Sequence, residues 1–105
     1  MKKLILLLFI PLVSFGQTGM ARQSGQTAKE YFESGREKYK NEDYYGAIAD
    51  YTKAIEIDPN YDYAYASRAN AKEELGDLNG ACADWKEAAK LGYDEAVKWV
   101  SDQCN

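Results

Sequence analysis

The sequence repeats itself at a spacing of 34 residues, and this repeat constrains the fold more than any other feature. Between residues 28–61 and 62–95, identical residues coincide at eight places: Tyr31/Tyr65, Lys38/Lys72, Asp43/Asp77, Gly46/Gly80, Ala47/Ala81, Ala49/Ala83, Asp50/Asp84 and Ala54/Ala88. The small and aromatic residues among them recur at helical spacing, and one such unit cannot bury its apolar face alone. The sequence therefore predicts an all-α fold of stacked helix pairs.

Local signals divide the first unit into two helices. Thr27 and Glu30 have the spacing of a capping box, which predicts a helix from there to about residue 41. Asp43 is expected to cap a second helix, which ends before Pro59 because proline cannot continue a helix. Since the connection between the two helices is short, they are expected to pack antiparallel.

The second unit follows the same plan and is followed by one more helix. A helix over about residues 61–75 precedes Gly76, which can take the left-handed conformation that often ends a helix. Asp77 is expected to cap the next helix, which ends at Gly92. Residues 94–104 predict a fifth helix, which closes the array.

The 34-residue unit resembles the tetratricopeptide repeat (TPR), in which W-x2-L-G-x2-Y, A-x3-F and P recur in each helix pair. The residues that carry the resemblance are Tyr31, Gly35, Ala47, Tyr51 and Pro59 in the first unit, and Tyr65, Ala69, Ala81 and Trp85 in the second. The resemblance implies a TPR-like domain over residues 27–105, with repeats at 28–61 and 62–95 and a capping helix at 94–104. Such a domain is a short α-solenoid of two antiparallel helix pairs plus a C-terminal capping helix.

The sequence departs from the TPR pattern at corresponding positions of the two units, and the second unit also lacks the terminal proline. The leucine of the pattern is replaced by Ser34 and Arg68, and its tyrosine by Lys38 and Lys72. Beyond the second unit, Trp99 stands one repeat length after Tyr65, which predicts that the last helix begins a third unit.

The first residues have the organisation of a secretory signal peptide. Two lysines precede an apolar run and a small-x-small site, which predicts a signal peptide over residues 1–16 and cleavage before Gln17. A membrane anchor needs about 20 apolar residues, and this run is shorter and contains Pro11. Residues 17–26 have no apolar period and predict a flexible linker. We therefore expect a small exported, bacterial-type TPR protein, periplasmic or secreted, without stable membrane insertion after processing.

The two cysteines of the chain occupy mirrored positions. In an antiparallel hairpin that turns around Tyr93, Cys82 lies as far before the turn as Cys104 lies after it. In an exported protein this arrangement favours a disulfide between Cys82 and Cys104, which would stabilise the domain by about 3 kcal/mol. The alternative is that Cys82 is a small core residue, as its counterpart Ile48 suggests, and that Cys104 is a free thiol.

Composition excludes several kinds of chemistry. The chain has no histidine, the commonest general base and transition-metal ligand, and it has no G-x-S-x-G or S-x-x-K motif. We therefore expect no catalytic residue, no metal site and no cofactor. Without residues 1–16, 11 basic side chains face 17 acidic ones, so the net charge of −6 repels phosphate backbones. Nucleic acid is not an expected partner.

The resemblance also implies where a partner would bind. In TPR arrays the first helices of successive units line a concave groove that receives a peptide or a helix of another protein. Carried onto this chain, the candidate peptide-binding groove consists of Phe32, Arg36, Tyr39, Lys40, Tyr63, Ala66, Asn70 and Glu73. The clamp that some TPR proteins use for the carboxylate tails of heat-shock chaperones is not expected, because Phe32, Arg36 and Ser67 stand at its first three positions.

Three functions are compatible with these features. The first is a non-enzymatic module that binds an unidentified protein or peptide through the concave face. The second is a structural protein that associates with itself as a homodimer. The third is a hydrolase, an activity associated with some disulfide-bearing helical repeat families, although the sequence offers no nucleophile signature for it.

Overall fold

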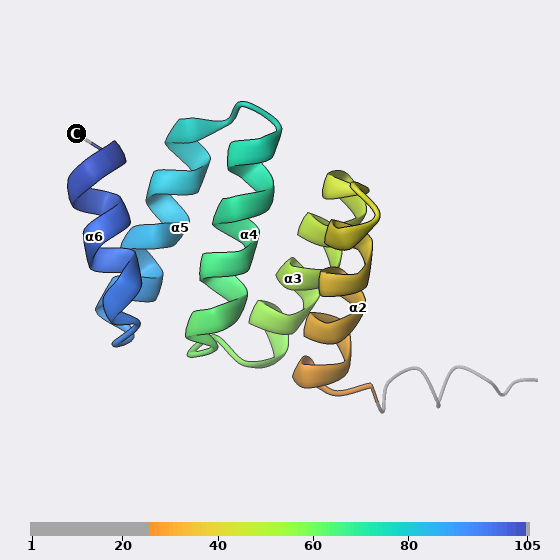
Figure 1. Ribbon diagram of the computed structural model, residues 1–105. Coiled ribbons are helices and arrows are strands. Elements are labelled where there is room, and N and C mark those ends of the chain that lie inside the picture. The colour runs from red at the N-terminus through yellow and green to blue at the C-terminus, as the bar shows by residue number, and fades with distance from the viewer. Residues whose placement is uncertain (1–25, 105) are drawn as a thin grey trace, which may run out of the picture.

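The computed structural model describes residues 26–104, which form five α-helices and no strand (Figure 1). The helices are α2 (Ala28–Lys40), α3 (Tyr44–Ile57), α4 (Asp62–Glu74), α5 (Leu78–Lys90) and α6 (Asp94–Gln103). The predicted signal peptide and residues 17–25 of the predicted linker lie outside the described residues. Within the described range, the predicted all-α fold of TPR-like helix pairs is confirmed.

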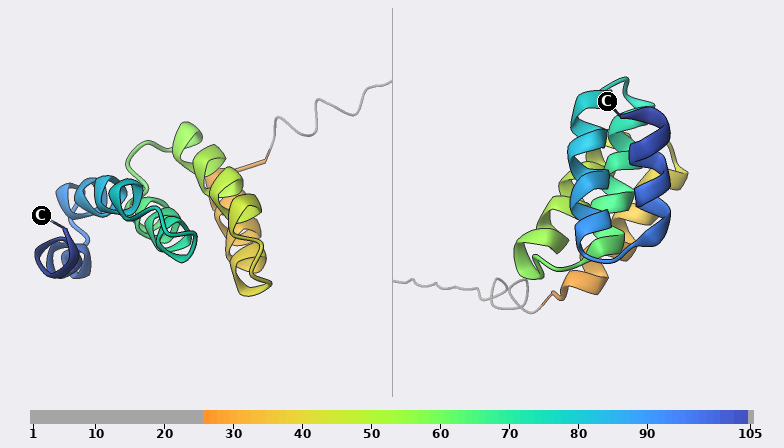
Figure 2. Two further views of the ribbon diagram at one scale, coloured as in Figure 1. Left: turned by 90° about the horizontal axis from the view of Figure 1, so that it is seen from above. Right: turned by 90° about the vertical axis from the view of Figure 1, so that its left-hand side faces the viewer.

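The helices form a short solenoid in which each packs chiefly against its neighbours in sequence. Figures 1 and 2 show α2 and α3 as a pair at one end, followed by the pair of α4 and α5, with α6 lying against α5 at the other end. Among the described helices, none has the length and the apolar content needed to cross a membrane.

Side chains cap three of the helices as predicted. In the capping box of α2, the Glu30 amide donates to Thr27 Oγ1 at 3.1 Å and the Thr27 amide donates to Glu30 Oε1 at 2.9 Å. Asp43 caps α3 and Asp77 caps α5, each by accepting a hydrogen bond from the backbone N–H three residues later. These bonds satisfy amides that have no partner within the helix.

The last helix begins earlier than the repeat predicts. Tyr61 is the N-cap of α4 and Tyr93 is the N-cap of α6, so α6 starts two residues early relative to the 34-residue spacing. The burial pattern follows this shift, because Ala64 and Ala96 hold corresponding places in the two helices and are both fully buried. Two one-residue differences produce this shift: α5 ends one residue early in the repeat, and the connection that follows has three residues where the one before α4 has four. The connection before α6 contains Gly92 with φ of 105°.

This shift corrects the predicted equivalence of Tyr65 and Trp99. Val97, not Trp99, takes the place in α6 that Tyr65 has in α4, and its side chain is 55% exposed. Trp99 packs instead against the core of the second unit, with its ring 5.9 Å from that of Trp85.

The core is built from small side chains around two large rings. Tyr51 in the first unit and Trp85 in the second are the largest fully buried side chains. The other buried apolar residues of the described range are Ala47, Ala54, Ala64, Ala66, Ala69, Ala71, Ala81, Ala88 and Ala96. At Gly35 a Cβ atom would come within 2.6 Å of Tyr51 Cε1, which explains the glycine at this helix crossing.

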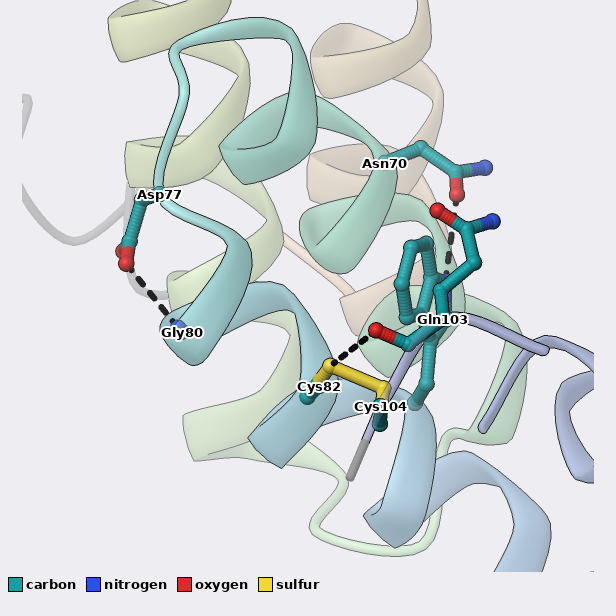
Figure 3. The surroundings of a disulfide bond; sticks show 7 residues. Asn70, Asp77, Gly80, Cys82, Gln103 and Cys104 are labelled. Carbon is teal, nitrogen blue, oxygen red and sulfur yellow. Dashed lines mark hydrogen bonds between the residues drawn. A yellow bond between two sulfur atoms is a disulfide. The ribbon is translucent and has the colours of Figure 1, made fainter. Parts of the chain in front are cut away.

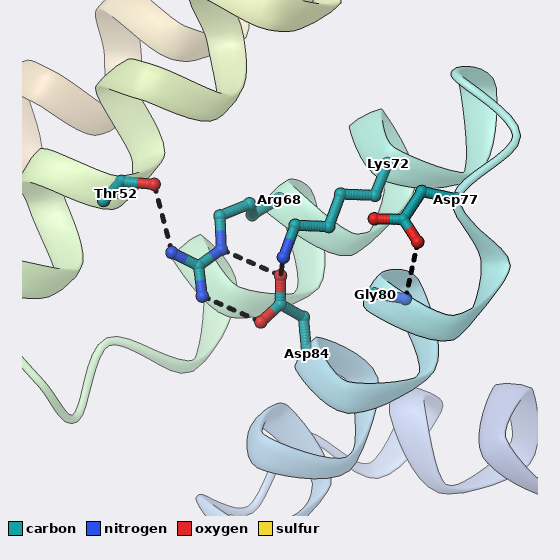
Figure 4. A network of polar contacts seen from close by, with 6 residues as sticks. All are labelled: Thr52, Arg68, Lys72, Asp77, Gly80 and Asp84. Carbon is teal, nitrogen blue, oxygen red and sulfur yellow. Dashed lines mark hydrogen bonds and ion pairs between the residues drawn. The ribbon is translucent and has the colours of Figure 1, made fainter.

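The departures from the TPR pattern in the second unit belong to one buried polar network (Figure 4). Asp84 is only 4% exposed, and both its carboxylate oxygens accept hydrogen bonds from Arg68 at 2.8 Å. Lys72 Nζ lies 3.0 Å from the same carboxylate. Arg68 also donates to Thr52 Oγ1 of α3 at 3.0 Å, so the network joins the two units. A buried carboxylate requires such partners, because burying it unpaired is costly.

The first unit contains a smaller version of this network. Ser34 Oγ donates to Asp50 Oδ2 at 2.6 Å, and Lys38 Nζ lies 3.0 Å from the same oxygen. Asp50 and its two partners stand one repeat before Asp84 and its partners. In each unit, therefore, the two residues that replace the leucine and tyrosine of the pattern bind the carboxylate of one aspartate on the facing helix.

Candidate functional site

A cleft of about 240 Å³ lies between the first helices of the two units. Its lining residues come from α2, α3 and α4, and they are Arg36, Tyr39, Lys40, Tyr51, Ser67 and Asn70. The side of α2 and α4 that lines this cleft is called the cleft face below.

The cations of the cleft are only weakly engaged within the chain. Arg36 Nη1 lies 3.2 Å from Glu33 Oε1, and Lys40 Nζ lies 3.8 Å from Glu37 Oε2. Both pairs are exposed to solvent on α2, and exposed pairs of this kind contribute little to stability. The two cations can therefore exchange these partners for groups of a ligand.

Asn70 is oriented toward the cleft by the core behind it. Its side-chain carbonyl oxygen accepts a hydrogen bond from the Trp85 indole N–H at 3.2 Å. This bond directs the oxygen toward Trp85 and leaves the amide NH₂ group as a donor. Asn70 can therefore donate to a carbonyl oxygen of a bound peptide.

Two tyrosines supply the apolar part of the cleft. Tyr51 is 2% exposed, and burial raises the pKa of its hydroxyl to about 12, so the group is neutral at physiological pH. Tyr39 is partly exposed, its ring packs edge-on against Tyr44 at 5.2 Å, and its hydroxyl donates to Glu74 Oε2 at 3.4 Å. Burial and the neighbouring Glu74 raise the pKa of Tyr39.

The structure brings together half of the predicted groove. Arg36, Tyr39, Lys40 and Asn70 line the cleft. Tyr63 and Glu73 are exposed but do not line it.

Two predicted groove residues serve packing instead. Ala66 is 4% exposed and belongs to the core around Trp85, because the α4 side chains that face α5 are buried. The Phe32 ring packs at a tilt against the rings of Tyr51 and Tyr61, with centroid distances of 5.7 and 5.0 Å. Neither side chain lines the cleft, and the burial of Ala66 corrects the prediction that this residue is available to a ligand.

Sequence reasoning missed Tyr51 and Ser67 as cleft residues. Tyr51 matches the aromatic position of the TPR pattern, which indicates packing. In the structure its ring lies against Gly35, and Tyr51 also lines the cleft. Ser67 stands one turn before Asn70 on α4, and this spacing was the available signal.

The two cysteines meet at the far end of the array (Figure 3). Cys82 Sγ of α5 and Cys104 Sγ lie 2.02 Å apart, with the Cα atoms 5.8 Å apart, which is disulfide geometry. A second cavity of about 490 Å³ lies beside them, lined by Leu78, Asn79, Cys82, Ala83, Lys86, Gln103 and Cys104. It shares no residue with the cleft.

Among residues 26–104, no group of three or more cysteine, aspartate or glutamate side chains is arranged to hold a metal ion. Several of the described acidic residues act instead as helix caps or ion-pair partners, as Asp43, Asp77 and Asp84 illustrate.

Comparison with known proteins agrees with the helical repeat. Residues 35–76 match the family model of the TPR repeat. The chain is 39% identical over 57 residues to the human small glutamine-rich tetratricopeptide repeat-containing protein beta. That match covers 54% of this chain but spans only 19% of the length of the human protein. The similarity therefore concerns the repeat, and TPR repeats generally mediate protein–protein interaction.

Proposed function

We propose that this protein is a non-enzymatic interaction module that binds a peptide segment of another protein on the cleft face. The observation that carries the proposal is the cleft between α2 and α4, where two weakly engaged cations, Arg36 and Lys40, lie beside a donor amide, Asn70. Peptide recognition needs polar groups for the backbone and apolar surface for side chains, and Tyr39 and Tyr51 provide the latter.

The test is a double substitution in the cleft. Arg36→Glu together with Tyr39→Ala is expected to weaken binding of the partner while the helical circular dichroism stays unchanged. The partner is first identified by crosslinking and mass spectrometry in the native cell envelope, and the binding of its peptides is then measured by fluorescence polarisation. Arginine and aromatic anchors often dominate binding energy, so a loss of at least about tenfold is expected.

The matched control is Lys53→Glu together with Tyr45→Ala, which makes the same kinds of change on exposed positions of α3 outside the cleft. Equal losses of affinity in the two double variants would contradict the proposal.

Two other outcomes would favour different roles. Unfolding of the domain by Tyr39→Ala alone would assign Tyr39 to the core. A dimer of residues 17–105 in light scattering that dissociates in the cleft variant would favour self-association instead.

We also propose that the chain is exported as a small bacterial-type TPR protein after removal of residues 1–16. The support is the order of lysines, apolar run and small-x-small site at the start of the sequence, together with the paired cysteines. Intact-mass measurement of the protein from the cell envelope is expected to give a chain that begins at Gln17. Recovery of a chain that retains residues 1–16 would refute the export proposal.

A further inference from the structure

We propose that the starts of α4 and α6 form a second contact surface, which receives a positively charged side chain, lysine or arginine, of the same partner. The surface consists of the exposed ring of Tyr63 with Tyr93, Asp62 and Glu95 around it. The inference rests on the proposed function, because it assigns a second residue of the peptide that the cleft would bind.

Tyr63 has no packing role that accounts for its exposed ring. It is 55% exposed, and the aromatic contact of its ring is an edge-to-face contact with Tyr93 at 5.2 Å. Tyr93 in turn packs edge-on against Trp99 at 5.8 Å and belongs to the core of the second unit. The inner rings thus hold Tyr63 on one side, and 55% of the residue's surface stays exposed to solvent.

The charge around this ring is negative and unpaired. Glu95 Oε1 accepts a hydrogen bond from the Tyr93 hydroxyl at 2.9 Å, and Asp62 Oδ1 accepts one from the Tyr63 amide at 2.8 Å. Within residues 26–104, neither carboxylate takes part in an ion pair. Both acids also balance the dipoles of the helices that start here, but neither helix supplies a counter-ion.

A cation satisfies both features of the surface at once. The face of an aromatic ring attracts a cation through its quadrupole, and Asp62 and Glu95 add attraction of the same sign. A carboxylate of the partner would be repelled here, and an aliphatic side chain would leave the two charges unpaired. Charge complementarity therefore selects lysine or arginine.

The spacing of this surface from the cleft defines the partner further. Tyr63 lies four residues before Ser67 and seven before Asn70, so it is on the cleft face of α4. Seven residues of α-helix span about 10 Å, and an extended peptide covers about 3.3 Å per residue. The cationic residue is therefore expected about three positions from the residue that occupies the cleft.

The experiment is an NMR titration of the ¹⁵N-labelled mature protein with two probes. The first is acetyl-Gly-Gly-Arg-Gly-Gly-amide, and the second replaces arginine by citrulline, which keeps the shape and removes the charge. Saturable shifts at the Tyr63 and Tyr93 amides and the Trp99 indole are expected with the arginine probe only. Equal shifts with both probes, no saturation, or shifts spread over the acidic surface would overturn the inference.

Substitutions provide the second readout. Tyr63→Leu keeps an apolar side chain without the ring and is expected to weaken the arginine probe about two- to fivefold, and Glu95→Gln about twofold. The control is Tyr45→Leu, an exposed tyrosine of α3, which is expected to change nothing. Unchanged affinity in both Tyr63→Leu and Glu95→Gln would overturn the inference. Shifts at Tyr63 that depend on protein concentration in the absence of the probe would also overturn it, because they would indicate that a second copy of the chain binds this surface. The probe has no side chain that the cleft would bind. Failure of the probe to bind therefore contradicts this inference alone, whereas the proposed function is tested separately by the Arg36 and Tyr39 substitutions.

Discussion

At the scale of single residues, Glu42 is the clearest case of local strain. It has φ of 63° in the turn between α2 and α3, and Gly76 holds the same place in the second unit with φ of 85°. The hydrogen bonds of the two turns also correspond, with Asp43 N donating to Lys38 O at 2.8 Å and Asp77 N to Lys72 O at 2.9 Å. The left-handed conformation is unfavourable for a residue with a Cβ atom.

We therefore expect Glu42→Gly to raise the free energy of unfolding by about 0.5–1 kcal/mol, measured by urea denaturation. The matched change in the opposite direction, Gly76→Ala, is expected to lower it by a similar amount. If Glu42→Gly lowers stability, the entropy of the unfolded glycine chain outweighs the relief of strain.

Tyr51 links burial to pH dependence. Burial raises the pKa of its hydroxyl from 10.0 to about 12, so the folded chain holds this proton more tightly than the unfolded chain does. The contribution to stability is fully present below pH 10 and is lost as the pH rises through about 12. The unfolding free energy is expected to fall over this window, and Tyr51→Phe is expected to make the fall shallower. If the unfolding free energy of the variant falls equally steeply with pH, the pH dependence arises from other tyrosines.

At the scale of elements, α6 depends most on a covalent partner. It has only 10 residues, and Ala96 is its one fully buried side chain among the described residues. Isolated helices shorter than about 12–15 residues are marginal in water. The Cys82–Cys104 bond therefore holds α6 against α5 where packing is weakest.

Cys82→Ser with Cys104→Ser is expected to lower the thermal midpoint by about 12–24 °C, for a loss of about 3 kcal/mol. Trp99 fluorescence should shift first, and reduction of the unmodified chain should reproduce the effect. Thiol titration of the unreduced, denatured protein tests the bond directly. Two free thiols per chain would refute the pairing, and a disulfide between chains would favour self-association.

At the scale of the whole molecule, the buried network around Asp84 joins the two units. Arg68 bonds both to Asp84 and to Thr52 of the preceding unit, whereas Asp50 bonds within the first unit. Asp84→Asn is expected to lower the unfolding free energy by about 3 kcal/mol, because it leaves the partly buried cations Arg68 and Lys72 without a carboxylate. Asp50→Asn is expected to cost less, since the Asp50 side chain is 13% exposed and that of Asp84 is 6% exposed. Equal losses in urea denaturation would contradict this difference.

The sequence predicted the helices and their caps but only part of the candidate site. Capping residues such as Thr27 and Asp77 bind backbone groups three residues away, so the local sequence is enough to predict them. The cleft depends on which side of α4 faces α2, and the TPR pattern alone assigned Ala66 to the groove although it is buried.

What the sequence by itself determined was the all-α repeat, because periodicity, caps and turn residues are local. Only the tertiary structure decided three further points: the early start of α6, the pairing of Arg68 and Lys72 with Asp84, and the place of Tyr51 in the cleft. Each of these depends on the distance between helices that are separate in sequence. That distance is set by how small and large side chains fit across a helix interface, as at Gly35 and Tyr51, and not by the period of either helix.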